Sequence, residues 1–404
     1  MEVIKKKTSK IKKTFVYAKT IYRTLPLFVR LVFWPIEKIN WLLSVLRLDL
    51  WILQGNEIVS KQKLDILYAG SEENRNFLIK SAFDNSYREN YIGKTWLWKI
   101  TNAVKERGHH CTLMIIEVPR SFRIFFKNQK CFYAPCWVEG EVDISDENFA
   151  LINKNISLKS DIRRVRKNKL NFEITNELKQ FHNFYYHMYI PHITKTHGDT
   201  AFIMDYDFLK NKFKNGDLLL IKKEKEYIAG MMLIYPRNKA RLLYLGIKDG
   251  NLDYVMEGAI GAMFYFSVQY LKEKGYKEVS FGLSRAFLKD GVLQYKKKWG
   301  LQIVETSKMG LIIKPLLETV GLRGFFLNNP LIYLDRMKLN GAIFVEPDQS
   351  FSEEYFEKIF KDFYLKGMSN LFIFQFGKLD SKTREIVPPE FCDKIRICST
   401  DCLF

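Results

Sequence analysis

Residues 218–248 read LLLIKKEKEYIAGMMLIYPRNKARLLYLGIK, three apolar runs separated by two short turn-like stretches. Runs of this length and spacing predict three β-strands joined as a meander. The next segment, YVMEGAIGAMFYFSVQYLKEKG (254–275), is too long for a strand and predicts an apolar helix closed by Gly275. A further strand, KEVSFGLS (277–284), follows. This order of elements indicates an α+β (mixed α/β) fold with a central mixed sheet flanked by helices.

The sequence on both sides of residues 218–284 also predicts a mixture of helices and strands. The amphipathic pattern of residues 178–193 predicts a helix that stops near Pro191, because proline interrupts helical hydrogen bonding. LQIVETSKMGLIIKP (301–315) predicts a strand pair. The other elements expected here are helices at 157–170 and 205–216 and a short strand at 172–174.

The first part of the chain and its tail also alternate between the helix-like and the strand-like pattern of apolar residues. KLDILYAG (63–70) predicts a strand, and three strand-like runs, CTLMIIEVP, RSFRIFFKN and KCFYAPCWV, fill residues 111–138. Helices are expected at 71–86, capped by Ser71, and at 96–108. In the tail, residues 341–347, 352–370 and 371–377 predict a small βαβ module, to which 389–400 adds a strand.

The composition limits the class of protein. The chain has 404 residues, 47% hydrophobic and 27% charged, the profile of a folded globular protein. Lysine and arginine exceed aspartate and glutamate by 64 − 45 = 19, so polyanionic partners are expected: nucleic acid, anionic lipid or phosphorylated metabolites. The six cysteines form no C-x-x-C pair and no zinc-type spacing with histidines, so we expect free thiols in a reducing cytosol and no metal.

The first fifty residues differ from the rest. In residues 1–30, nine lysines and arginines stand against the single acid Glu2, with large apolar side chains between them. Charged residues, Pro26 and Pro35 interrupt every window that could cross a bilayer. We expect amphipathic helices on an anionic membrane surface, and so a cytoplasmic, peripheral protein at the inner face of the plasma membrane. An ordinary packed helix with a solvated lysine face and a nucleic-acid contact are the alternatives.

Three stretches together resemble the GNAT acyltransferase superfamily, and within it the tandem, FemAB-like branch. SLKSDIRRVRKN (157–168) is a basic helix start that opens the second half. FYYHMYIPHITKTHGDTA (184–201) is similar to that branch's Y…Y-x-P…H-G segment. DGVLQYKKKWG (290–300) is similar to its G-x-x-x-x-K-x-x-[FW]-G turn. The likeness covers residues 60–315.

The residue patterns at the two ends of the chain and the resemblance between them together predict a domain plan. It consists of a basic membrane-surface segment (1–55), a first GNAT-like domain (56–156) and a second GNAT-like domain (157–315). A C-terminal α/β module (316–404) completes the chain.

The resemblance also implies transfer of an acyl or aminoacyl group from an activated carrier to an amine. The acceptor would be a membrane-linked, cell-envelope or sugar amine. The donor would be acyl-CoA, an acyl carrier protein or an aminoacyl-tRNA. GNAT enzymes hold coenzyme A with a [QR]-x-x-G-x-[GA] loop, and here that place reads LGIKDGNLDYVMEG (245–258), with Gly250 but without the full signature. This departure favours an aminoacyl-tRNA or a carrier-protein thioester.

Acyl transfer to an amine needs a base, oxyanion donors and cations for a phosphorylated donor. On a helix Arg163 and Lys167 share a face with Arg164 beside them, so they form either a phosphate-binding stripe or a solvated basic surface. His197, in a loop beyond Pro191, is a candidate base or substrate contact or a plain loop histidine.

The remaining candidates lie in the matching stretches. Tyr189 is either catalytic or a core aromatic, and Asp290 begins a turn at the third stretch. Lys296 and Lys298 can hold a carboxylate or phosphate, and Trp299 can pack on the fold or stack on the acceptor. A non-catalytic, membrane-docked binding protein that keeps the fold is the second reading, and a nucleic-acid binder is the third.

Overall fold

The computed structural model describes residues 43, 45–126, 129–145, 147, 156–198, 203–236, 239–377 and 386–403. Most of the basic segment predicted at 1–55 lies outside them. Two compact units divide the described chain. The smaller holds residues up to Trp51 together with Tyr91–His109, and the larger holds Ile52–Asn90 and the chain from His110 onward.

The smaller unit contains the start of β1 (Arg47–Glu57), the end of β3 (Phe83–Trp96), the 3-10 turn η1 (Leu97–Lys99) and helix α4 (Ile100–Arg107). The sequence predicted amphipathic helices in the segment 1–55. This prediction is wrong from Arg47 onward, because strand β1 begins there. Leu48, Leu50 and Ile52 are buried and alternate with less buried neighbours, the period of two that a strand shows.

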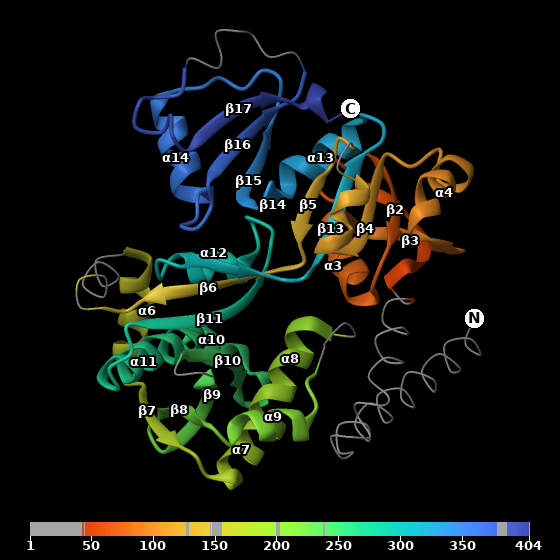
Figure 1. Cartoon of the computed structure of the whole chain (residues 1–404). Coiled ribbons are helices and arrows are strands. Elements are labelled where there is room, and N and C mark those ends of the chain that lie inside the picture. The colour runs from red at the N-terminus through yellow and green to blue at the C-terminus, as the bar shows by residue number, and fades with distance from the viewer. Residues whose placement is uncertain are drawn as a thin grey trace. The chain divides into compact units, whose positions relative to one another are not determined.

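The first sheet of the larger unit brings together distant parts of the sequence. Its strand order is β3-β1-β2-β4-β13-β5. Strand β13 (Met309–Pro315) lies antiparallel between β4 (Leu113–Pro119) and β5 (Phe132–Pro135), as Figure 1 shows. Helix α3 (Glu72–Ala82) follows β2 (Lys63–Ala69).

The run RSFRIFFKN, predicted as a strand, forms the 3-10 helix η2 (Arg120–Phe126) instead. Ile124 and Phe125 are both exposed and Phe126 is buried, so the side chains do not alternate between two faces as those of a strand would. The prediction that Ser71 caps α3 is confirmed, because its side chain accepts a hydrogen bond from the Asn74 amide.

The second sheet contains the predicted meander. Its strand order is β12-β6-β11-β10-β9-β8-β7. The strands are β6 (Trp137–Asp143), β7 (Asn171–Thr175), β8 (Gly216–Lys223), β9 (Glu226–Ile234), β10 (Ala240–Ile247), β11 (Glu278–Arg285) and β12 (Gln302–Thr306).

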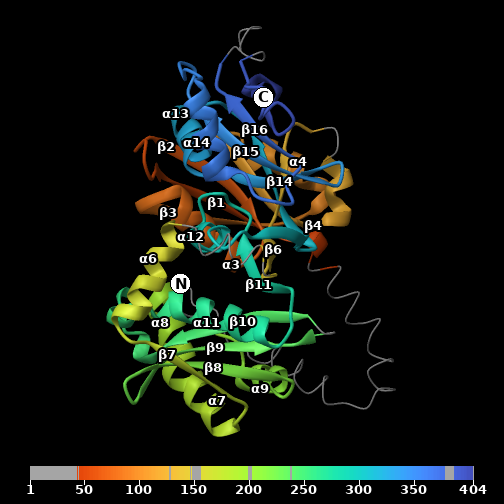
Figure 2. The same cartoon turned by 90° about the vertical axis from the view of Figure 1, so that its left-hand side faces the viewer.

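Helices cover both faces of this meander, and the fold class predicted from the sequence is confirmed. Helix α11 (Ala259–Glu273) packs on one face of β8 and β9, and α9 (Tyr206–Phe213) packs on the other (Figure 2). Leu219 of β8 belongs to the hydrophobic core with α11, and its neighbour Leu218 belongs to the core on the α9 side. Because both faces are buried, the strands read as continuous apolar runs.

The strand pair expected at 301–315 is not a pair. Strand β12 lies against β6 in the second sheet, and β13 lies in the first sheet between β4 and β5. Both are strands, as predicted, but each pairs with residues more than 150 positions away. A strand's partner depends on the whole sheet rather than on its own sequence.

The helix expected to stop near Pro191 continues past it. Helix α7 (Leu178–Phe184), a π-helical turn η3 (Tyr185–Tyr189) and α8 (Ile190–His197) follow one another. Pro191 lies in the first turn of α8, directly after the π-helical turn, and the backbone stays helical through Tyr189 and Ile190.

The C-terminal module is a four-stranded sheet of order β14-β15-β16-β17. The predicted βαβ unit is present, because β15 (Lys338–Val345) and β16 (Asn370–Gln375) are parallel and α14 (Glu353–Phe363) joins them (Figure 1). The added strand is β17 (Ile395–Ser399). Helix α13 (Val320–Asn328) and strand β14 (Leu331–Asp335) precede this unit.

Two further sequence expectations concern cysteines and membranes. All six cysteines are free thiols, as expected. Within the described part of the chain, no helix combines the length and the apolar character needed to cross a bilayer.

Candidate functional site

Two parallel neighbours of the second sheet, β10 and β11, separate after a short contact. Each strand has eight residues, but only Ala240↔Val279 and Arg241↔Ser280 are in register. Beyond this point β10 is irregular between Leu242 and Leu245, where it faces β9, and Gly282 of β11 adopts a left-handed φ of 70°. Bulges of this kind bend a strand and interrupt its hydrogen-bond ladder.

The paired end of the two strands is held by Glu139 of β6. Its Oε2 accepts a hydrogen bond from Arg241 Nη2 at 2.9 Å, and its Oε1 accepts one from Ser280 Oγ at 2.6 Å. The Ser280 hydroxyl in turn accepts from the Gly282 amide at 3.2 Å. One carboxylate thus links β6, β10 and β11 where the divergence begins.

A pocket of about 290 Å³ lies at the end of β11. Residues of helices α3 and α12 (Gly291–Lys297) contribute to its wall together with residues of β6 and β11. Its lining residues are Glu73, Asn76, Phe77, Lys80, Trp137, Leu283, Ser284, Arg285, Asp290 and Val292. Ligand sites commonly lie beyond the carboxyl ends of parallel strands, where neighbouring strands part.

Arg285 contacts two aromatic rings and two hydrogen-bond acceptors in this pocket, which we call the β11 pocket. Its guanidinium carbon lies 3.8 Å from the Trp137 ring centroid and 4.7 Å from that of Phe77. It donates a hydrogen bond to Glu73 Oε1 at 2.9 Å and another to Asn74 Oδ1. Burial lowers the pKa of this arginine, and the Glu73 carboxylate opposes the shift. Two rings and two acceptors hold the guanidinium in one orientation.

Asp290, one of the predicted catalytic residues, lines the β11 pocket and caps α12. Its carboxylate accepts a hydrogen bond from the Leu293 amide at 2.9 Å. Burial raises the pKa of the Asp290 carboxyl, and the Leu293 amide and the Lys296 charge oppose the shift. A carboxylate with a raised pKa is a stronger base than an exposed one, which suits proton abstraction from an ammonium group.

Lys296 is buried, with 5% of its surface exposed. Its Nζ donates a hydrogen bond to the Leu283 carbonyl at 2.8 Å. Burial lowers the pKa of Lys296 to about 8, against the opposing charge of Asp290. The sequence predicted a lysine that holds a ligand, whereas the geometry gives a lysine that holds the main chain of diverging β11.

The two neighbours of Lys296 in the predicted motif have different positions. Trp299 is buried between Phe264 and Phe281, with ring centroids 6.1 and 5.9 Å away, so it packs on the fold. The Lys298 ammonium lies 5.5 Å from the Tyr295 ring centroid. Neither residue lines the β11 pocket.

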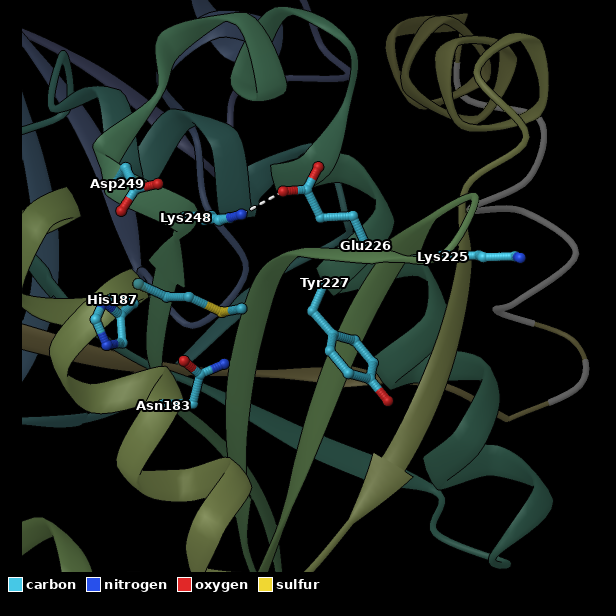
Figure 3. A pocket seen from close by; sticks show the side chains of 8 residues that line it. Asn183, His187, Lys225, Glu226, Tyr227, Lys248 and Asp249 are labelled. Carbon is cyan, nitrogen blue, oxygen red and sulfur yellow. Dashed lines mark hydrogen bonds and ion pairs between the residues drawn. The ribbon is translucent and has the colours of Figure 1, made fainter.

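A second pocket, of about 460 Å³, lies where β10 ends in the turn η6 (Lys248–Gly250). Figure 3 shows Lys248 directed toward Glu226, with which it forms an ion pair. The Lys248 hydrogen bond lowers the pKa of Glu226. The other lining residues are Asn183, His187, Met188, Lys225, Tyr227 and Asp249. We call this the β10 pocket.

Gly250, the predicted cofactor-binding glycine, lies beside this turn but faces a helix. A Cβ atom at Gly250 would lie 2.8 Å from the Pro191 carbonyl oxygen and 2.8 Å from Lys195 Cδ. The backbone at Gly250 therefore packs closely against α8. The neighbouring pocket is lined by the carboxylates of Asp249 and Glu226 and by the ammonium groups of Lys225 and Lys248.

The predicted residues of the α7–η3–α8 segment are structural neighbours of β10. Tyr189 is buried, and its hydroxyl accepts a hydrogen bond from the Met204 amide at 3.2 Å. Burial raises the pKa of Tyr189. His197 is the last residue of α8, so its expected position in a loop is wrong. Its side chain lies outside what the structure describes.

The cationic stripe on α6 (Ile156–Lys167) is exposed. Arg163, Arg164 and Lys167 all lie on the surface, and Arg164 pairs with Asp161 at 3.3 Å. Neither the β10 pocket nor the β11 pocket includes a residue of α6. The helix packs against α11, and its phosphate-binding role stays a prediction.

Sequence reasoning missed Arg285, Trp137, Glu73 and Ser284. Ser284 is buried in the wall of the β11 pocket, and its hydroxyl has no hydrogen-bond partner among the described residues. An arginine that directly follows an apolar strand, in SFGLSR (280–285), was the available signal. The other residues come from distant segments, which no local pattern connects. No three His, Cys, Asp or Glu side chains converge as metal ligands in the described ranges.

Comparisons with known proteins give matches among solved structures only. No protein-family model matches the chain, and no curated protein does. FemX matches with 13% identity over 66% of this chain and 84% of that chain, at a TM-score of 0.36. The C-terminal domain of a putative lysylphosphatidylglycerol synthetase from Agrobacterium fabrum matches with 14% identity over 65% and 80%, at 0.33.

A GCN5-related N-acetyltransferase from Sphaerobacter thermophilus matches with 8% identity over 64% and 75% of the two chains, at a TM-score of 0.29. These three TM-scores range from 0.29 to 0.36, so the GNAT-like resemblance stays a prediction from the sequence. Identities this low concern the fold alone, and they leave activity and substrate open.

Proposed function

We propose that this chain is a GNAT-like N-acyltransferase or aminoacyltransferase. It moves an acyl group from an activated carrier to the amine of a membrane-linked, cell-envelope or sugar acceptor. The divergence of β10 and β11 is the observation that carries the proposal, because each separated strand ends at its own pocket. A transfer reaction has two substrates, and two pockets at the ends of adjacent parallel strands suit that need.

The β11 pocket is the acceptor side of this proposal. The Asp290 carboxylate takes the proton from the ammonium group, and the free amine attacks the carrier-bound carbonyl carbon. The carbon–sulfur or carbon–oxygen bond to the carrier then breaks, and the leaving group is protonated. Backbone amides at the irregular part of β10, Leu242–Leu245, are the candidate donors to the developing oxyanion. No covalent enzyme intermediate is required.

The donor is an aminoacyl-tRNA or a carrier-protein thioester in preference to coenzyme A. The packing of Gly250 against Pro191 supports this choice. The charge excess of 19 and the exposed α6 stripe of Arg163, Arg164 and Lys167 suit a large polyanionic carrier. One matched structure is named FemX, and another is named as a putative lysylphosphatidylglycerol synthetase, a name that refers to a lipid.

The test is transfer by the purified full-length chain. Acetyl-CoA, an acyl carrier protein thioester and charged total tRNA are offered in turn with a bacterial membrane lipid extract or an amino sugar. Mass spectrometry detects the new amide. Val292, 54% exposed on the wall of the β11 pocket, is changed to Trp to fill the pocket. Val304, 48% exposed on β12 and outside both pockets, is changed to Trp as the control.

We expect amide formation with at least one donor, a loss of about tenfold or more in Val292→Trp, and wild-type rates in Val304→Trp. If no donor yields an amide, or if both variants match the wild type, the proposal is overturned.

A further inference from the structure

Three large apolar side chains project from two segments that are far apart in the sequence. Ile124 and Phe125 of η2 are 70% and 58% exposed, and Met337 is 69% exposed. Met337 lies at the tip of the hairpin between β14 and β15. We call these residues, with the charges around them, the η2–hairpin patch. None of them lines the β10 or β11 pocket.

Direct contacts hold the two segments of the patch together. Arg120 Nη2 lies 3.1 Å from Met337 Sδ, and Arg123 Nη1 donates a hydrogen bond to the Leu334 carbonyl at 3.1 Å. The Arg120 amide donates to the Lys308 carbonyl at 2.7 Å, which joins the turn before β13 to the same surface. The patch therefore belongs to the folded larger unit.

Basic residues lie on the same segments as the apolar side chains and on the adjoining turn before β13. The five basic residues at this surface are Arg120, Arg123, Lys308, Arg336 and Lys338. Lys308, Arg336 and Lys338 are exposed, and Asp335 is the acid of the hairpin tip. Exposed apolar side chains with basic residues on the same segments match an anionic bilayer, in which lysine and arginine meet the headgroups and the apolar groups enter the acyl boundary.

The hairpin tip has an unfavourable backbone for its sequence. Arg336 and Met337 are the two loop residues, and their φ angles are 43° and 71°. Two-residue hairpin loops of this kind favour Asn and Gly, because other side chains are strained at positive φ. A long cation and a flexible apolar side chain thus occupy positions where the fold alone would favour smaller residues. Backbone strain of this kind often marks a functional surface.

We propose that the η2–hairpin patch docks the folded body of the protein on an anionic lipid bilayer. Ile124, Phe125 and Met337 insert between headgroups, and the five cations bind their phosphates. A bilayer accepts several separate protruding side chains, whereas a protein partner would need a matching cavity for each. The inference is independent of acyl transfer and of the basic N-terminal segment.

Flotation of the full-length protein with vesicles tests this proposal, without donor or acceptor present. One set of vesicles contains phosphatidylcholine with 30% phosphatidylglycerol, and the other contains phosphatidylcholine alone. Phe125→Glu removes the apolar side chain and adds a repelled charge. Met337→Gly removes the apolar group of the hairpin at a φ that glycine prefers, so the fold is kept or stabilised, and Ile124 is left in place. The control is Leu252→Glu with Met256→Glu, two exposed apolar residues of α10 (Leu252–Met256).

We expect the wild type to float with the anionic vesicles and not with the neutral ones. Phe125→Glu with Met337→Gly lowers the partition coefficient about tenfold or more, while the melting temperature stays within a few degrees. The Leu252 and Met256 control changes the partition coefficient less than about twofold. If the patch variant floats like the wild type, the basic N-terminal segment carries all binding and the proposal is overturned. If the wild type binds neither vesicle, the proposal is also overturned.

Discussion

The ammonium nitrogen of Lys296 lies 2.8 Å from the carbonyl oxygen of Leu283, the residue at which β11 resumes after its irregular stretch. The pair joins α12 to the strand that has separated from β10. Because Lys296 is 5% exposed and its pKa is lowered to about 8 by burial, this contact places a costly group in the interior. The position of β11 beside its pocket depends on that lysine.

The first prediction concerns the pH dependence of this lysine. Its pKa of about 8 in the folded state lies below the ordinary 10.5. Below pH 8 Lys296 is protonated in both the folded and the unfolded chain, and the folded chain bears the full free-energy cost of burying the charged ammonium group. Between about pH 8 and pH 10.5 the unfolded chain binds the proton that the folded chain has released, so this group raises stability with pH, by up to about 1.4 kcal/mol per unit.

Lys296→Met removes this contribution. Denaturant unfolding at pH 7, 8, 9 and 10 should give a wild-type curve that rises relative to the variant curve above pH 8. Lys297, whose pKa is also lowered to about 8 by burial, is present in both proteins and cancels in the difference. Parallel curves for the two proteins would show that Lys296 does not titrate in this window.

The second prediction concerns Arg285. Arg285→Lys keeps the charge but loses the planar stack between Trp137 and Phe77 and one of the hydrogen bonds to Glu73 and Asn74. We expect a loss of about 2–3 kcal/mol in the free energy of unfolding. Chemical denaturation measures it.

Arg323→Lys is the matched control for Arg285. Arg323 is a more exposed arginine, which pairs with Glu318 and lies 5.5 Å from the Phe376 ring centroid. Its replacement should cost less than about 1 kcal/mol, because exposed ion pairs contribute little. Equal losses in the two variants would mean that the stacked arrangement adds nothing to an ordinary surface arginine.

The sequence predicted the elements of the second sheet better than their partners. The apolar runs at 218–248 form β8, β9 and β10 because both of their faces are buried, a property that each run carries in its own composition. Strand β13 also reads as a strand, but nothing in residues 309–315 indicates that it lies between β4 and β5. Pairing of this kind is set by the whole molecule.

The site was less predictable than the fold for the same reason. Asp290 was found because the motif around it is local, and it lines the β11 pocket. Arg285, Trp137 and Glu73 come from three segments that meet only in the folded chain. Lys296 was predicted to hold a carboxylate or phosphate, and Trp299 to pack on the fold or stack on the acceptor, but burial gives both of them a structural environment that the sequence alone could not show.

The third prediction separates the charge of Asp290 from its capping role. Asp290→Asn keeps a side-chain oxygen for the Leu293 amide, so the stability should change by less than about 0.5 kcal/mol. The proposed base is lost, and kcat/KM for transfer should fall about 100-fold. In the wild type, burial raises the Asp290 pKa above its ordinary 3.8, so activity should increase with pH as this carboxyl loses its proton.

The control for Asp290 is another aspartate that caps a helix. Asp205 caps α9 and accepts a hydrogen bond from the Phe208 amide at 3.0 Å, outside both pockets. Asp205→Asn should leave both kcat/KM and stability unchanged. An Asp290→Asn enzyme as active as Asp205→Asn would exclude Asp290 as the base.

The fourth prediction concerns the close approach of η3 to β10. A Cβ atom at Gly246 would lie 2.5 Å from the Met188 carbonyl carbon and 2.5 Å from the Tyr189 amide nitrogen. These are backbone atoms, which cannot move aside as a side chain can. Gly246→Ala should therefore lower the free energy of unfolding by about 3 kcal/mol or more.

Gly291→Ala is the control for Gly246→Ala. Nothing lies within 4 Å of a Cβ at Gly291, which begins α12, so alanine there should be neutral or stabilising by about 0.5 kcal/mol. Thermal unfolding of both variants compares them directly. Met188 and His187 line the β10 pocket, which is left for the donor if the β11 pocket takes the acceptor, so Gly246→Ala should change the KM for the donor more than the KM for the acceptor. Unchanged stability in Gly246→Ala would mean that η3 packs less closely on β10 than the structure has it.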